Sequence, residues 1–138
     1  MIRYRPGRSL KPFRHTWLWC LLWCLGIAGL VVLSLMPGPP MPDFEDSDKV
    51  GHFLAYGLLA AGAVQLYGRW SALLGAGIAL VLLGIGLEYA QGAFTDDRVL
   101  DARDALANTI GVIAGLATQL TPLRDLLLRL DGGRDRRR

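Results

Sequence analysis

Residues 71–91 read SALLGAGIALVLLGIGLEYAQ, and this stretch decides the fold. It stays apolar over about 20 residues, the length that a helix needs to cross the hydrocarbon core of a membrane. Its strongly polar residues, Glu88 and Gln91, come only at the end, three positions apart and therefore on one face of the predicted helix. An acidic side chain close to hydrocarbon costs free energy unless it has a partner, so Glu88 is a functional candidate.

Three further apolar runs complete a set of four predicted membrane spans, at about 17–36, 50–67, 71–90 and 105–120. Four prolines between positions 37 and 42 end the first span, because proline cannot continue a helix. The fourth span is short, yet it is apolar enough to insert beside three neighbours. The predicted fold is therefore all-α, an integral membrane four-helix bundle.

The membrane domain, residues 17–120, is flanked by two basic segments. Residues 1–16 form a basic cytoplasmic segment. Within 121–138, Thr121 fits a helix cap and Pro122 a first helical turn. The residues that follow at helical spacing are Leu123, Leu126, Leu127 and Leu130. We expect a short amphipathic helix on the membrane surface there, and then a disordered basic tail that begins at Asp131.

The basic residues are unequally distributed over the two sides of the predicted membrane. Only Lys49, Arg98 and Arg103 fall on one side. The other twelve are Arg3, Arg5, Arg8, Lys11, Arg14, Arg69, Arg124, Arg129, Arg134, Arg136, Arg137 and Arg138. Basic residues mark the cytoplasmic side, so both termini are expected in the cytoplasm, as an even number of spans requires. A cleaved signal peptide at 1–36 is disfavoured, because the apolar run is too long and no small-x-small site follows it.

The composition argues against some other classes of protein. The chain is 52% hydrophobic, with a formal net charge of +3. Its arginines flank apolar runs and form no continuous stripe, so we predict no nucleic-acid partner. Cys20 and Cys24 lie four positions apart on one predicted helix. This spacing favours small packing residues over a disulfide or a metal site.

Small residues mark the predicted contacts between helices. Ala107, Gly111 and Gly115 recur every four residues along the fourth span. Lipid provides no hydrophobic drive between helices, so close approach of their backbones must hold them together. We favour packing of this seam inside one chain, and a homodimer seam is the alternative.

Polar side chains occur at the ends of three spans, on the side away from the termini. They are Asp48, His52 and Tyr56 on the second, Glu88 and Gln91 on the third, and Asp101, Asp104 and Asn108 on the fourth. Each set follows helical spacing, so each shares one helix face. We expect the three faces to meet at a common depth below the outer surface, with His52 and Glu88 facing each other.

Several of these residues also have simpler explanations. Asp101 is a good candidate for the N-cap of the fourth helix, where an acid also suits the helix dipole. Asn108 fits an interhelical hydrogen bond, and Tyr56 fits an interfacial aromatic residue. Arg98 and Arg103 fit ion pairs with nearby aspartates.

The motifs, in this order, resemble the VanZ-like family of small bacterial integral membrane proteins. The resemblance covers roughly residues 30–120 and rests on DKVGHFLAY at 48–56, EYAQ at 88–91 and DARDALAN at 101–108. It implies a multi-pass protein of the bacterial cytoplasmic (inner) membrane with a role in the cell envelope. The family's founding member is linked to low-level resistance to the glycopeptide teicoplanin. The family's characteristic polar positions correspond here to Asp48, Lys49, His52, Tyr56, Glu88, Gln91, Arg98, Asp101, Asp104 and Asn108.

The first functional hypothesis is a site at the outer leaflet that binds a membrane lipid or a lipid-linked envelope precursor. The polar residues would bind the head group while the helices hold its tails, and the basic residues would contact phosphate. The predicted ligand-binding residues are Asp48, Lys49, His52, Tyr56, Glu88, Gln91, Arg98, Asp101, Arg103, Asp104 and Asn108. We identify no cofactor and predict no resident metal.

Two alternatives use the same residues. In the first, the chain is an enzyme that acts on a lipid-linked substrate, with His52 as general acid or base, positioned by Glu88 or Asp48. A divalent ion bound by His52, Glu88, Asp101 and Asp104 would support phosphoryl or glycosyl transfer there. In the second alternative, the His52–Glu88 pair is a purely structural clamp that holds four short helices together.

Overall fold

The structure is a computed structural model of the chain, and it describes residues 8–37, 46–94 and 100–132. Five α-helices and two 3-10 turns make up this part of the chain, without a sheet. The long helices are α1 (Thr16–Leu35), α2 (Ser47–Leu66), α3 (Trp70–Phe94) and α4 (Ala102–Ala117). They lie within a few residues of the four predicted spans. The chain then continues through η1 (Thr118–Leu120), η2 (Pro122–Asp125) and the short helix α5 (Leu126–Leu130).

Two of the described helices, α1 and α3, are long and apolar enough to cross a membrane. A third candidate is the pair Ala102–Leu120 and Pro122–Leu130, which bends by 80° at its break. The helix α2 begins with polar residues, among them Lys49 and His52, and is not among these candidates. The structure therefore shows a helical chain with two or three candidate membrane spans, in place of the four that we expected.

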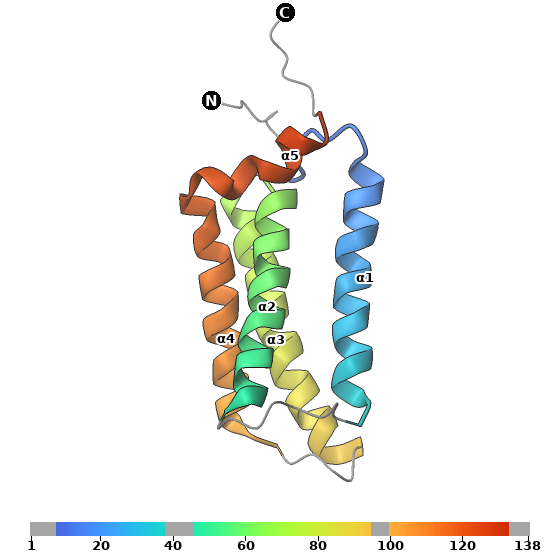
Figure 1. Ribbon diagram of the computed structural model, residues 1–138, viewed down its shortest axis with the longest axis vertical. Coiled ribbons are helices and arrows are strands. Elements are labelled where there is room, and N and C mark those ends of the chain that lie inside the picture. Colours follow the sequence, from blue (N-terminus) through green and yellow to red (C-terminus); the bar gives the residue numbers. More distant parts are fainter. Residues whose placement is uncertain (1–7, 38–45, 95–99, 133–138) are drawn as a thin grey trace, which may run out of the picture.

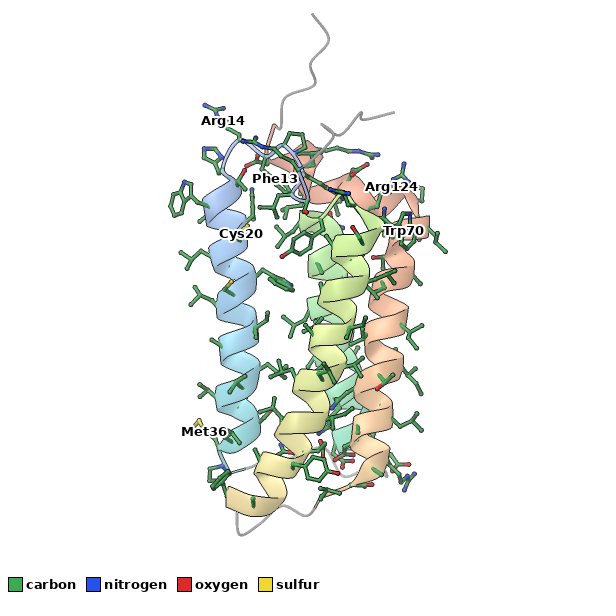
Figure 2. All side chains as sticks on the ribbon, turned by 180° about the vertical axis from the view of Figure 1, so that it is seen from behind. Phe13, Arg14, Cys20, Met36, Trp70 and Arg124 are labelled. Carbon is green, nitrogen blue, oxygen red and sulfur yellow. The ribbon has the colours of Figure 1, made fainter. Side chains whose placement is uncertain are left out.

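The four long helices run alternately up and down, side by side (Figure 1). The start of α1 and the helix α5 lie at one end, where Phe13, Arg14 and Arg124 gather, and we call this the basic end (Figure 2). The starts of α2 and α4 lie at the opposite end, near Met36 (Figure 2). We call it the acidic end, after Asp46, Asp48, Glu88, Asp101 and Asp104.

The helices α2 and α4 pack closely because both carry glycine at the contact. A Cβ atom added at Gly111 would collide with the carbonyl oxygen of Phe53, and one added at Gly115 would collide with that of Gly57. From the other side, a Cβ atom at Gly57 would lie 3.3 Å from the carbonyl oxygen of Gly111. The glycine seam predicted for the fourth span therefore packs inside the chain, against α2.

The helix α1 lies at the outside of the bundle and buries none of its side chains. The indole Nε1 of Trp23 donates a hydrogen bond to the carbonyl oxygen of Leu59 in α2, at 2.9 Å. Closer to the acidic end, the carbonyl oxygen of Ser34 accepts a hydrogen bond from Nε2 of Gln91 in α3, at 2.8 Å. These hydrogen bonds, together with the partly buried side chains of Trp19, Trp23 and Leu30, hold α1 in place.

At the basic end, a buried lysine joins the N-terminal segment to the C-terminal turns. The Nζ of Lys11 donates to the carbonyl oxygen of Val64 at 2.7 Å and to that of Arg124, and it lies 3.0 Å from Oδ1 of Asp125. Lys11 is 1% exposed. Burial disfavours the charged ammonium and lowers the pKa of Lys11. The nearby Asp125 carboxylate raises this pKa, but by less than burial lowers it.

The C-terminal turns differ from the expected amphipathic helix. Thr121 does cap the segment, accepting a hydrogen bond from the backbone N–H of Leu123, and Pro122 follows in the first turn. The segment then divides into η2 and α5, and Leu128 is the leucine that packs inward, against Phe13. Of the predicted apolar set, Leu123, Leu126 and Leu130 are exposed, and Leu127 is partly buried beside Leu128.

Asp131, which we expected to begin a disordered tail, contacts the start of α1. Its carboxylate accepts hydrogen bonds from the backbone N–H of Arg14 and from Nε1 of Trp19, the latter at 2.8 Å, and Nδ1 of His15 lies 3.0 Å away. Burial would raise the pKa of Asp131, but these hydrogen bonds outweigh it and lower the pKa. The remainder of the predicted tail, residues 133–138, lies outside the described residues.

The glycine seam leads to a first prediction. We expect Gly115→Ala to lower the free energy of unfolding by about 1–3 kcal/mol, the usual cost of overpacking, because the added methyl group meets the α2 backbone. Gly75→Ala is the matched control, since a Cβ atom there meets nothing within 4 Å. The control should be neutral or stabilised by up to about 1 kcal/mol, since alanine is the better helix former. Reversible unfolding in detergent measures both, and equal effects would contradict the seam.

The buried pair at the basic end leads to a second prediction. Lys11→Met should cost about 3 kcal/mol of unfolding free energy, because it leaves Asp125 buried without its main cation. This value is at the low end for a broken buried pair, since Arg124 Nε lies 3.5 Å from Asp125. Adding Asp125→Leu should recover most of the loss. A double-mutant cycle in detergent measures the coupling, and additive losses would show that the two side chains act independently.

Candidate functional site

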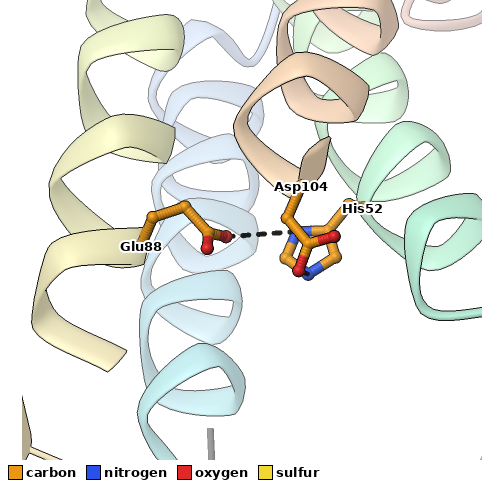
Figure 3. Close-up of side chains that lie close together, drawn as sticks. All are labelled: His52, Glu88 and Asp104. Atoms are coloured by element: carbon orange, nitrogen blue, oxygen red, sulfur yellow. Dashed lines mark ion pairs between the residues drawn. The ribbon is translucent and has the colours of Figure 1, made fainter. Parts of the chain in front are cut away.

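The candidate site lies between α2, α3 and α4 at the acidic end. His52 enters it from α2, Glu88 from α3 and Asp104 from α4 (Figure 3). One nitrogen or oxygen atom from each of the three side chains lies within 4.8 Å of the other two. The convergence of His52 and Glu88 predicted from the sequence is therefore observed, and Asp104 joins them.

His52 is the centre of this cluster. Its Nδ1 lies 2.9 Å from Oδ1 of Asn108 and 4.0 Å from Oε1 of Glu88, while its Nε2 lies 3.6 Å from Oδ2 of Asp104. An amide oxygen only accepts hydrogen bonds, so Nδ1 is the donor to Asn108. The opposite nitrogen, Nε2, then faces the Asp104 carboxylate. A neutral ring has a lone pair at Nε2, so this contact is favourable only if a proton or another cation lies between the two.

Glu88 is the most deeply buried acid of the cluster, with 4% of its surface exposed. Its Oε1 faces His52, but its Oε2 has no hydrogen-bond partner among the described residues and is buried as well. A buried carboxylate oxygen without a partner loses its hydration and gains nothing in return. The site therefore has unused capacity to bind a cation or a hydrogen-bond donor.

Lys49 connects the acids at the rim of the cluster. Its Nζ lies 3.1 Å from Asp48 and 3.3 Å from both Asp101 and Asp104. It also lies 3.7 Å from Asp46. The side chain of Lys49 is 18% exposed. Its ammonium group thus lies between the buried cluster and the surface, where it partly neutralises the surrounding carboxylates.

Asp101 is the N-cap of α4, which confirms the simpler explanation given above. Its side chain accepts a hydrogen bond from the backbone N–H of Arg103, at 2.8 Å. This hydrogen bond, together with the nearby Lys49, lowers the pKa of Asp101. Asp101 therefore both starts the helix that carries Asp104 and faces Lys49.

The other predicted site residues do not all lie at the cluster. Tyr56 is buried one turn below His52, where Gly84 leaves room for it and for Asn108. Gln91 is also buried, but its Nε2 binds Ser34 of α1, so it contacts a different helix from the one that we expected.

Asp48 and Arg103 are more exposed, with side-chain exposures of 50% and 68%. Arg98 lies outside the described residues. Sequence reasoning missed Asp46, which lies 3.4 Å from the Arg103 guanidinium and directly precedes α2 with a φ of 61°. Aspartate tolerates this left-handed conformation better than most residues, and an aspartate just before a helix was the available signal.

We compared the chain with family models, curated proteins and solved structures, and none matched. The site must therefore be interpreted from its own chemistry. It offers carboxylates, one imidazole, one ammonium group and an amide, with the most deeply placed carboxylate only partly satisfied. Such a set binds polar or charged groups, and it is enclosed by helices that present apolar side chains to the outside.

Proposed function

We propose that this chain is a four-span protein of the bacterial cytoplasmic membrane whose outer end binds the head group of a lipid or of a lipid-linked envelope precursor. The observation that carries the proposal is the polar cluster at one end of an apolar bundle, in which Glu88 is buried and His52 and Asp104 are partly buried between three helices. Membership of the VanZ-like family, and through it a link to teicoplanin resistance, belongs to this proposal and rests on the motifs.

The proposed orientation follows from the charges at the two ends. The basic end carries Arg14 and Arg124 (Figure 2), Lys11 beside Asp125, Arg69 directly before α3 and Arg129 in α5, and the acidic end carries mainly carboxylates. Basic residues are enriched on the cytoplasmic side of membrane proteins, which supports a cytoplasmic basic end and an outward acidic end.

The proposal of four spans depends on α2, which is too polar to qualify alone. Its polar residues lie within its first turns, and the rest of the helix buries Tyr56, Ala60 and Val64 against the bundle. A helix whose neighbours cover it needs less apolar surface of its own than one that faces lipid on all sides. This supports α2 as the second span.

A lipid-like ligand fits the surroundings of the cluster. On α2 and α4, large apolar side chains such as Leu54, Leu106 and Ile110 are about half exposed near the acidic end. Acyl or polyprenyl tails would lie against such residues, and the head group would then be at the depth of Lys49 and His52. The Lys49 ammonium can donate to a phosphate oxygen, and His52 can donate from Nε2 when its ring is protonated.

The test is to replace His52 and to measure which lipids co-purify with the chain. We expect His52→Gln to reduce co-purified phosphate-bearing lipid by about tenfold to a hundredfold, the equivalent of one lost hydrogen bond to a charged group. Native mass spectrometry identifies the lipid by its mass. A glycerophospholipid and a polyprenyl-linked precursor are thus distinguished in one measurement.

His15→Gln is the matched control, because it makes the same change to the chain's other histidine, at the basic end. It should leave lipid co-purification unchanged. If His52→Gln instead lowers the melting temperature strongly and leaves the lipid content unchanged, the cluster is a structural clamp and the proposal is wrong.

A further inference from the structure

We propose that His52, Glu88 and Asp104 form a binding site for a divalent transition-metal ion of the zinc type. The site goes beyond the proposed lipid binding and does not depend on it. It is argued from the donor set, the distances, the unused oxygen of Glu88 and the charge balance at the acidic end.

The donor set and its spacing fit such an ion. One imidazole and two carboxylates, from three different helices, offer atoms within 4.8 Å of one another. Two ligands about 2.0–2.1 Å from a tetrahedral zinc ion lie about 3.4 Å apart. His52 Nε2 and Asp104 Oδ2 are 3.6 Å apart, close to this spacing. Glu88 Oε1 lies 4.0 Å from Nδ1 of the same ring, so the Glu88 carboxylate has to rotate toward Nε2 to complete the site.

Two unsatisfied contacts point to a missing cation. The Oε2 atom of Glu88 is buried without a hydrogen-bond partner among the described residues, on a side chain that is 5% exposed. In addition, His52 Nε2 faces a carboxylate although Nδ1 already donates to Asn108. A metal ion between the three side chains satisfies both contacts at once.

Asn108 supports the same interpretation. A histidine that binds a metal through one nitrogen almost always donates from the other nitrogen to a carbonyl or carboxylate oxygen, which fixes the ring orientation. Here the Nδ1–H of His52 has such an acceptor in Asn108, which is 1% exposed and therefore held firmly. The ring is thus presented with Nε2 toward Asp104.

The charges at the acidic end also favour a cation. Among the described residues of the acidic end, five carboxylates are accompanied by two permanent cations, Lys49 beside four of them and Arg103 beside Asp46, while Glu88 faces His52. A divalent ion would balance most of the excess. The imidazole ligand favours zinc or a similar transition metal over calcium and magnesium, which prefer oxygen ligands alone.

The binding test uses the full chain, without a histidine tag, after treatment with a chelator in lipid-free detergent. Zinc chloride is titrated in, and bound zinc is measured by calorimetry and by elemental mass spectrometry. We expect one zinc ion per chain. Glu88→Gln and Asp104→Asn should each weaken the affinity by at least about tenfold. Asp46→Asn, which removes an acid at the same end but outside the cluster, should bind zinc as tightly as the unchanged chain.

A second measurement separates a metal site from a His52–Glu88 ion pair. Without metal, Glu88→Gln should be as heat-stable as the unchanged chain or more stable, because it removes a partly unsatisfied buried carboxylate. Zinc should then raise the melting temperature of the unchanged chain and not that of Glu88→Gln.

Three outcomes would overturn the metal site. They are the absence of saturable zinc binding, equal binding by Glu88→Gln, and a metal-free loss of stability in Glu88→Gln without any zinc-dependent shift. The last outcome would identify a protonated histidine as the missing cation. Because no lipid is present, failure of the lipid experiment above leaves this test unaffected, and the two proposals are judged separately.

Discussion

The close approach of the α2 and α4 backbones is the constraint on which the rest of the structure depends. Gly111 and Gly115 allow α4 to approach the carbonyl oxygens of α2 directly, and a side chain at either position would force the two helices apart. About one turn from Gly111, this arrangement brings His52 within hydrogen-bond distance of Asn108, and the next turn brings it near Asp104. A membrane offers no hydrophobic force to press helices together, so the geometry of the cluster relies on small residues and dispersion.

The two ends of the bundle differ in how fully their buried charged groups are hydrogen-bonded. At the basic end, the ammonium of Lys11 has three acceptors, one for each of its hydrogens, and the charge of Asp125 balances its own. At the acidic end, Glu88 is buried to a similar degree, and one of its oxygens has no hydrogen-bond partner among the residues that the structure describes. A buried charge whose hydrogen bonds are all made within the chain has a structural role. A buried carboxylate with a free oxygen can still bind a ligand, and for this reason we locate the function at the acidic end.

The features that were predicted correctly from the sequence are those that depend on the spacing of residues along a helix. The four long helices, the Asp101 cap and the meeting of His52 with Glu88 all follow from helical spacing and from the alternation of helix direction. The features that the sequence did not predict depend on contacts between residues that are far apart in the chain. Lys11 and Asp125, or Arg14 and Asp131, are more than a hundred positions apart, and nothing in the spacing of either residue indicates its partner. Gln91 shares a helical face with Glu88 but lies one turn further on, where α1 is the neighbour, and only the packing of α1 reveals this.

The outer position of α1 has a consequence for how this chain tolerates change. Because α1 buries no side chain and accepts its bond from Gln91 through a backbone carbonyl, its contacts depend little on which apolar residues it carries. The exceptions are Trp23, seated against Gly62, and Trp19, whose indole N–H binds Asp131. The opposite holds for α2, where a methyl group added at Gly57 would meet the backbone of α4 and where the methyl group of Ala60 leaves no room for a side chain at Gly115. Relatives of this chain would therefore diverge fastest in their first helix and slowest along the face of the second helix that the fourth one covers.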